Sequence, residues 1–237
     1  MNLSGFRLAA SVLTTTSLML VTASCAHPRI ARLESDDWEV QEKAAIDIRE
    51  GYNGTVRDLI RVAEQTTPYK FSFKFPLWRV PAKYWAICLL GDLRASEAVR
   101  ILLDNLTYPN PRYCGSSPCD RAVYPSADSL IEIGTPAVGP VTERLRGCGE
   151  DDLERHLCVL VLREVLGADL AEAHLTTAIG EVEGQLPGER TPSRMKYLHG
   201  LIANLKAARE LVPNLTSWRW RKALEKRTDD ELLIPSS

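Results

Sequence analysis

The sequence predicts an all-α protein built from about five pairs of helices. Three observations support this fold class. Apolar residues recur every three or four positions through most of the chain after residue 36, which is the spacing of an amphipathic helix. Glycine or proline stands between the two apolar sets of each clear pair. Only residues 71–75 alternate clearly in the manner of a strand, and this stretch is short.

The composition narrows the classes of function. The chain has 237 residues, of which 45% are hydrophobic and 25% charged, as in ordinary globular proteins. Lys and Arg number 29 against 31 Asp and Glu, and this balance argues against a nucleic-acid partner, for which a basic excess is typical. With six cysteines and four histidines, the sequence offers little for a His-rich metal enzyme, and we expect no cofactor.

The clearest pair of predicted helices lies in residues 82–106. Gly91-Asp92 separates two apolar sets, and we predict that the first helix breaks there. The first set is Ala82, Ala86, Ile87 and Leu90, and the second is Ala98, Val99, Leu102, Leu103 and Leu106.

A second pair, in residues 126–145, repeats this arrangement. Gly134 follows the first apolar set, and Pro136 stands at the predicted start of the next helix, where its missing N–H has no helical partner anyway. The apolar sets are Ala127, Leu130 and Ile133, and then Ala137, Val138, Val141 and Leu145.

These two frames resemble HEAT repeats, especially the HEAT-like type of phycobilisome lyases. The match rests on Leu90-Gly91-Asp92 with Ala98-Val99, and on Ile133-Gly134 with Pro136-Ala137-Val138. The resemblance is looser in residues 36–64, 152–182 and 193–231, which we assign to three further pairs. It implies an α–α superhelix, a HEAT/armadillo-like solenoid, that interacts with a partner rather than performing chemistry. A nonrepetitive helical bundle is the alternative.

The N-terminal residues 1–24 read as an export signal. Arg7 is followed by Leu8–Val21, an uncharged run too short and too polar for a membrane span. Ala23-Ser24-Cys25 resembles a bacterial lipobox, although Thr22 stands where Leu is usual. The resemblance implies a lipid-anchored protein of the cell envelope, with lipid on Cys25 and no inner-membrane retention signal at Ala26. Cleavage without lipidation, giving a periplasmic or secreted protein, is the alternative.

The remaining boundaries follow from these predictions. Residues 25–35 are assigned to a linker, 36–212 to the helical repeats, and 213–237 to a C-terminal capping helix and tail. The predicted cap, Ser217–Glu231, carries an apolar face that would pack on Leu201, Leu205 and Ala208. Its basic residues leave a second interpretation open, in which this helix lies on anionic lipid.

The first long inter-pair segment is rich in aromatic and basic residues. No acidic residue occurs from Gln65 to Trp85. Such a stretch either folds its aromatic rings onto the helices or forms a contact surface for a glycan, a protein or lipid head groups. The candidate binding residues are Tyr69, Phe71, Phe73, Phe75, Trp78 and Arg79, and Tyr84 and Trp85 end the stretch.

The cysteines suggest disulfides more than metal. Cys114 and Cys119 flank a short, turn-rich segment, and we predict a disulfide between them in an exported protein. Cys148 and Cys158 either form another bond or include a buried thiol at Cys158, and Cys88 is most simply a core thiol. A zinc site is disfavoured because no paired Cys-x-x-Cys spacing is present.

No catalytic motif stands out. The histidines lie apart and outside any His-Glu-x-x-His frame, and neither a Gly-x-Ser-x-Gly nor a phosphate-binding glycine loop is present. We therefore expect a noncatalytic scaffold of the envelope that binds a protein partner. The alternative is a module that binds a glycan or envelope polymer, centred on residues 69–85.

Overall fold

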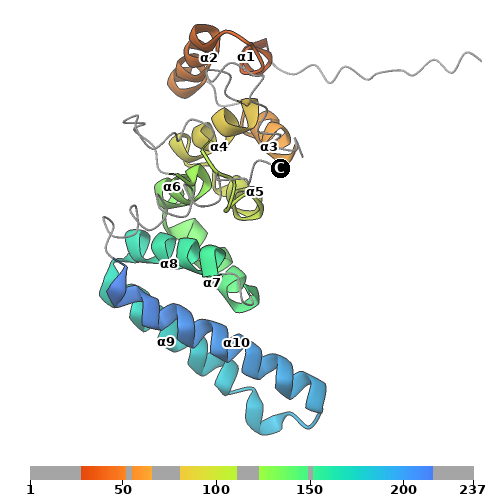
Figure 1. Ribbon diagram of the computed structural model, residues 1–237, viewed down its shortest axis with the longest axis vertical. Coiled ribbons are helices and arrows are strands. Elements are labelled where there is room, and N and C mark those ends of the chain that lie inside the picture. The colour runs from red at the N-terminus through yellow and green to blue at the C-terminus, as the bar shows by residue number, and fades with distance from the viewer. Residues whose placement is uncertain (1–27, 52–54, 66–80, 111–122, 149–151, 216–237) are drawn as a thin grey trace, which may run out of the picture.

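The computed structural model describes residues 28–51, 55–65, 81–110, 123–148 and 152–215 (Figure 1). Within these residues the chain is all-helical and contains no strand. Three 3-10 turns, η1 to η3, cover Ser96–Ala98, Leu186–Gly188 and Val212–Asn214. The ten α-helices of the described ranges are α1 (Pro28–Arg32), α2 (Trp38–Gly51), α3 (Val56–Glu64), α4 (Ala82–Asp92), α5 (Val99–Asp104), α6 (Pro125–Ile133), α7 (Thr135–Gly147), α8 (Asp152–Leu166), α9 (Ala168–Glu183) and α10 (Pro192–Leu211).

The helices are stacked in chain order along the long axis of the molecule (Figure 1). Contacts join every second helix: α2 packs on α4, α4 on α6, α6 on α8 and α8 on α10. A second series joins α3 to α5 and α5 to α7. The last helix departs from this order, because α10 also packs on both α7 and α9. The predicted all-α class is confirmed.

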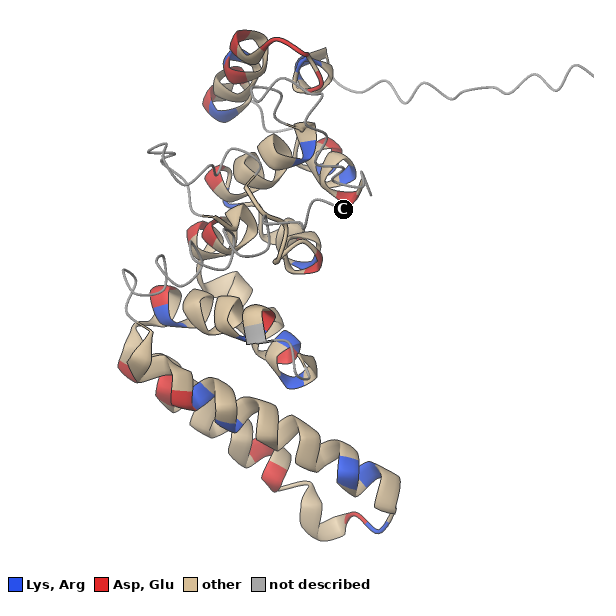
Figure 2. Ribbon diagram, viewed as in Figure 1, with Lys and Arg blue, Asp and Glu red and all other residues tan. Residues whose placement is uncertain are grey.

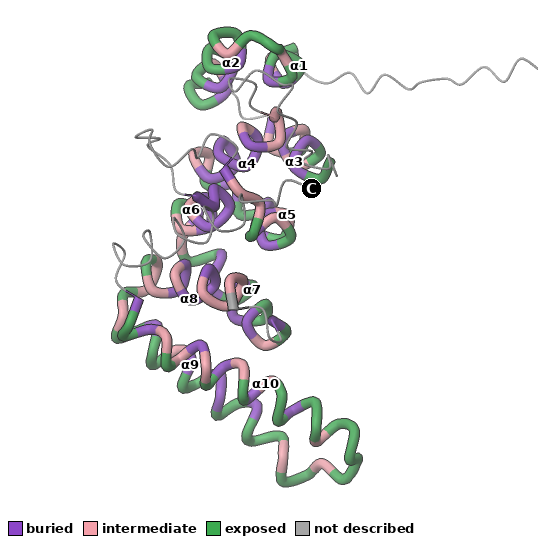
Figure 3. The backbone as a smooth tube through the Cα atoms, in the orientation of Figure 1, coloured by how far each residue is buried: buried purple, intermediate pink, exposed green. Residues whose placement is uncertain are grey.

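A continuous hydrophobic core runs through the stack (Figure 3). Several of its largest fully buried side chains come from the apolar positions that the sequence spacing identified, such as Ile87, Leu102, Leu130 and Leu145. Burial of each such side chain contributes roughly 1.5–3 kcal/mol relative to an exposed one. The core therefore joins helix pairs that are distant in sequence.

The predicted break at Gly91-Asp92 is confirmed, since α4 ends at Asp92, and Gly91 has a second role there. It lies within the last turn of α4, which continues to Asp92 before the chain turns at Leu93 and Arg94. A Cβ atom on Gly91 would stand 2.6 Å from the Cα of Ser129 on α6. The Ser129 hydroxyl donates a 2.8 Å hydrogen bond to the Ile87 carbonyl. Gly91 is thus required for the close approach of α4 to α6.

Gly134 and Gly167 do mark helix boundaries, as predicted for Gly134. Their φ angles are +78° and +84°, in the left-handed region that favours glycine. Gly134 caps α6 and Gly167 separates α8 from α9. Pro136 lies in the first turn of α7, as expected.

Residues 28–35, which the sequence analysis assigned to a linker, are structured. They include α1, and both Ile30 and Leu33 are buried in the core. The Arg29 guanidinium donates a 3.2 Å hydrogen bond to the carbonyl of Asp47 on α2. The helical body thus begins before residue 36. The predicted signal 1–24 and the capping helix 217–231 lie outside the described residues.

Candidate functional site

Four aromatic rings gather where α2, α4 and the end of α5 meet. We call Trp38, Tyr84, Trp85 and Tyr108 the aromatic cluster; its rings surround the buried Cys88. Trp38 opens α2, Tyr84 and Trp85 lie in the first turn of α4, and Tyr108 follows α5. The fold therefore brings together residues from three separate parts of the chain: the start of α2, the start of α4 and the segment after α5.

The two tryptophans form the centre of the aromatic cluster. Their ring centroids are 4.9 Å apart with planes tilted by 32°, and the Tyr84 ring meets Trp85 edge-on at 5.8 Å. These distances fall in the range favoured for aromatic pairs. Tyr84 is buried, whereas Trp38, Trp85 and Tyr108 keep part of their surface accessible. The aromatic cluster thus combines one buried ring with three residues that are partly accessible.

A buried glutamine fixes the position of Trp85. The Trp85 indole donates to Gln41 Oε1 at 3.2 Å. The Gln41 Nε2 group donates to the carbonyls of Leu33 at 2.9 Å and Ser35 at 2.8 Å. Because both ends of the amide are used, Gln41 links the α1–α2 connection to α4 without leaving a buried polar atom unpaired.

Lys83 supplies the positive charge of the site. Its ammonium group donates to the Gln65 carbonyl at 3.1 Å and lies 5.4 Å from the Tyr108 ring centroid, within cation–π range. Partial burial lowers the pKa of Lys83. Gln65 directly follows α3 and Lys83 lies in the first turn of α4, so this contact joins the end of α3 to the start of α4 beside the aromatic cluster.

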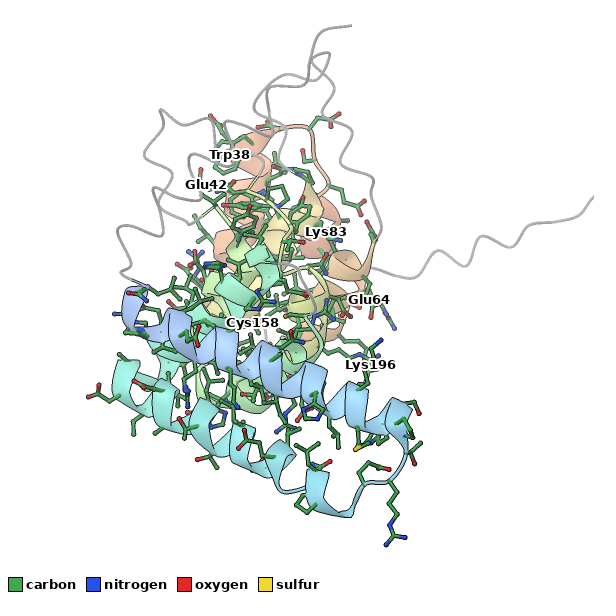
Figure 4. All side chains as sticks on the ribbon, turned by 60° about the horizontal axis from the view of Figure 1, so that its bottom comes forward. Trp38, Glu42, Glu64, Lys83, Cys158 and Lys196 are labelled. Atoms are coloured by element: carbon green, nitrogen blue, oxygen red, sulfur yellow. The ribbon has the colours of Figure 1, made fainter. Side chains whose placement is uncertain are left out.

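The arrangement suits binding more than catalysis. Ring faces and an ammonium group can contact a sugar, a protein side chain or a phosphate. Figure 4 shows Trp38, Glu42 and Lys83 near one end of the stack, far along it from Lys196 on α10. Within the described residues no nucleophile–base pair accompanies the aromatic cluster.

The sequence-predicted residues divide into two groups. Tyr84 and Trp85 are described and pack inward, in line with the interpretation that these rings fold onto the helices. The other predicted binding residues, lipidation site and disulfide lie outside the described residues; they are Tyr69, Phe71, Phe73, Phe75, Trp78, Arg79, Cys25, Cys114 and Cys119.

Sequence reasoning did not find Trp38, Gln41 or Tyr108 as members of the site. Trp38 and Tyr108 are far from residues 69–85 in the chain. The packing of α2 on α4 brings Trp38 there, and the chain after α5 brings Tyr108. The sequence offered one signal for these residues: Tyr108 lies at the start of the second long segment between helix pairs.

Other polar groups form no reactive centre in the described part of the chain. His174 Nε2 lies 2.8 Å from the Thr142 hydroxyl, which itself donates to the Val138 carbonyl at 2.9 Å. Because the Thr142 hydroxyl proton is used in that bond, the hydroxyl oxygen accepts a hydrogen bond from His174. The Thr142–His174 pair therefore links α7 to α9. Among the described residues no group of three His, Cys, Asp or Glu side chains is placed to hold a metal ion.

None of the described helices is both long and apolar enough to cross a bilayer. Comparison with protein-family models, curated proteins and solved structures finds no match for this chain.

Proposed function

We propose that the chain is a noncatalytic, envelope-located scaffold of HEAT-like helix pairs, anchored by lipid on Cys25, that binds a protein partner. The observation that supports it best is the pattern of helix contacts. Even-numbered helices from α2 to α10 contact in series, and so do α3, α5 and α7. Stacked helix pairs produce this pattern, and such stacks present long surfaces used for binding.

Site-specific photo-crosslinking in intact cells tests the scaffold hypothesis. A photoreactive residue would replace Arg57 on α3 and Arg100 on α5, and in parallel Glu42 on α2 and Glu132 on α6, all of which are exposed. A partner that lies along one of these two series of helices contacts several of its helices. We therefore expect the same protein to be captured from both positions of one series, either α3 and α5 or α2 and α6, and from neither position of the other series. Capture of unrelated proteins at each position, or of none, would contradict the hypothesis.

Lipid anchoring has its own test. Cys25→Ala should abolish acylation, so the protein should move from the detergent phase to the aqueous phase or remain an unprocessed precursor. Mass spectrometry of the wild-type N-terminus gives the direct readout. A mature wild-type chain that begins after Cys25, or that carries no lipid on it, removes the anchor from the proposal.

The second candidate function is binding of a glycan or envelope polymer at the aromatic cluster. It is favoured by one observation: the partly accessible Trp38 and Tyr108 belong to one aromatic cluster, and the Lys83 ammonium group lies near the Tyr108 ring and bonds to the Gln65 carbonyl. Aromatic faces beside polar groups are suited to sugar rings.

Co-sedimentation of the purified protein with isolated peptidoglycan distinguishes this candidate. Trp38→Ala and Lys83→Ala should each weaken sedimentation several-fold if the aromatic cluster is the site. Tyr197→Ala is the matched control, since Tyr197 is an exposed aromatic residue on α10 with Arg194 5.0 Å from its ring centroid. Equal sedimentation of all three variants would exclude the aromatic cluster as a glycan site.

A further inference from the structure

We infer that Cys148 and Cys158 are an oxidisable dithiol that closes into a disulfide between α7 and α8. Cys148 directly follows α7 as its C-cap residue, and Cys158 lies near the middle of α8. The two helices pack against each other, and both thiols are buried. The inference concerns the chemistry of this pair, and its occurrence in the cell rests on the proposed export.

Both thiols belong to the same buried core, and α7 packs on α8 there. A hydrogen bond to Cys148, together with burial, raises the pKa of Cys158 well above its ordinary value. A disulfide requires the two sulfur atoms to approach to about 2.0 Å. Cys88, the third buried cysteine of the described ranges, belongs instead to the aromatic cluster.

The surroundings make the two thiols unequal. Cys158 is 0% exposed, whereas Cys148 is 7% exposed and lies at a helix end. Arg144 pairs with Glu154, one turn before Cys158 on α8. Because Cys148 is the less deeply buried of the two, it is the sulfur that an oxidant reaches first. Cys158, whose pKa is raised, attacks in the second step.

The exchange needs a disulfide as oxidant, either a small one such as oxidised glutathione or that of an envelope oxidoreductase. Cys148 loses its proton and attacks one sulfur of the oxidant, which forms a mixed disulfide and releases one thiolate. Cys158 then loses its proton and attacks the Cys148 sulfur, which releases the second thiolate. The two thiolates take up the two protons, so the cysteine pair is oxidised and the oxidant becomes two thiols.

Peptide mapping after incubation of the full chain with oxidised glutathione tests the pair directly. Remaining thiols are alkylated in denaturant, and trypsin then separates residues 147–155 from 156–163 because Arg155 lies between the cysteines. We expect these two peptides to appear joined, and to separate after reduction. Cys88, in residues 84–94, is the internal control and should remain alkylated. If Cys148 and Cys158 are both alkylated in the oxidised sample, the inference is wrong.

Two variants test the order of attack. In Cys158→Ala the mixed disulfide has no second thiol to resolve it, so glutathione should accumulate on Cys148. In Cys148→Ala the buried Cys158 should remain unmodified under the same conditions. Glutathione on Cys158 and not on Cys148 would overturn the assigned order. Wild-type mapping needs neither variant to fold, and circular dichroism shows whether each variant does.

The wild-type protein also provides a thermal readout. Reduction should lower its melting temperature by a few degrees, because the bond closes a short loop between two packed helices. This shift should be smaller in Cys148→Ala, where the predicted Cys114–Cys119 bond still responds to reduction but the α7–α8 bond cannot form. Failure of the lipid-anchor test would remove the proposed location but leave the glutathione result unchanged, so the two proposals fail separately.

Discussion

Helix α4, at the centre of the stack, and the C-terminal hairpin formed by α9 and α10 differ in how much of their surface is buried. In α4 every residue from Ala86 to Gly91 is buried, because α2, α3 and α6 all pack around it. In α10, a longer helix, only Leu198, Ile202, Leu205 and Ala208 are buried. Figure 3 shows this contrast in the accessible outer sides of α9 and α10.

The charges follow the same division. α4 carries only Lys83 and Asp92, whereas charged residues recur along α9 and α10 (Figure 2). A helix with neighbours on several sides can carry few charges, while a helix with one buried stripe needs a polar outer face. The comparison indicates that stability is concentrated around α4 and α6, and that the hairpin tolerates change.

The largest expected difference concerns removal of one leucine side chain from each region. Leu90 in α4 is 0% exposed, whereas Leu170 in α9 is 64% exposed. Leu90→Ala should lower the free energy of unfolding by about 2–5 kcal/mol, since it removes buried contacts and leaves a cavity. Leu170→Ala should change it by less than about 0.5 kcal/mol. Urea unfolding followed by circular dichroism measures both, and equal effects would contradict the comparison.

Adding a methyl group should act in opposite directions in the two regions. Gly91→Ala forces a Cβ to within 2.6 Å of the Ser129 backbone, so α4 and α6 must separate. We expect a loss of about 1–3 kcal/mol. At Gly180 in α9 a Cβ meets no atom within 4 Å. There Gly180→Ala should stabilise the protein by roughly 0.5–1 kcal/mol, because alanine loses less backbone entropy in a helix.

The helices could be predicted from the sequence because each exposes at least part of its surface, which makes the apolar spacing visible. The close approach of α4 to α6 at Gly91 could not be predicted. A glycine that ends a helix and a glycine that makes room for a neighbouring helix look the same in the sequence, because the partner residue, Ser129, is not known. α1 was missed for a related reason. It is a single short turn whose buried residues, Ile30 and Leu33, show no extended periodicity.

The candidate site was predictable only in part. Residues 69–85 drew attention through composition, which led to Tyr84 and Trp85. Trp38 and Gln41 lie on another helix, and their contact with Trp85 depends on the packing of α2 on α4. No local pattern contains that information. For Cys158 the sequence left open a bond to Cys148 or a buried thiol; in the structure both cysteines are buried thiols.

Gln41 gives a test of intermediate size. Gln41→Leu keeps the approximate volume but leaves the Leu33 and Ser35 carbonyls and the Trp85 indole without this partner. We expect about 1–3 kcal/mol of destabilisation, with a shift in tryptophan fluorescence. Gln185→Leu is the control, because Gln185 is exposed and makes one weak 3.3 Å bond to its own helix. An unchanged stability in Gln41→Leu would show that the α1–α2 connection is not fixed in this way.

The smallest expected effect lies in the turn between α9 and α10. Glu189 Oε1 accepts the backbone N–H groups of Thr191 at 2.7 Å and Arg190 at 2.9 Å, just before α10 begins. These hydrogen bonds, that of Thr191 above all, lower the pKa of Glu189 in the folded protein. A lowered folded-state pKa stabilises the protein above the unfolded pKa, and this contribution disappears as the pH falls through the folded value.

A titration of Glu189 by carboxyl-detected NMR should therefore give a midpoint below the ordinary glutamate value of about 4.3. Glu189→Gln should be slightly less stable than wild type at neutral pH and equal to it in acid, where the wild-type carboxyl group is protonated. Because the side chain is exposed to solvent, the difference should also shrink as salt is added. A gap between the two proteins that persists unchanged in acid would show that the carboxylate charge does not hold this turn.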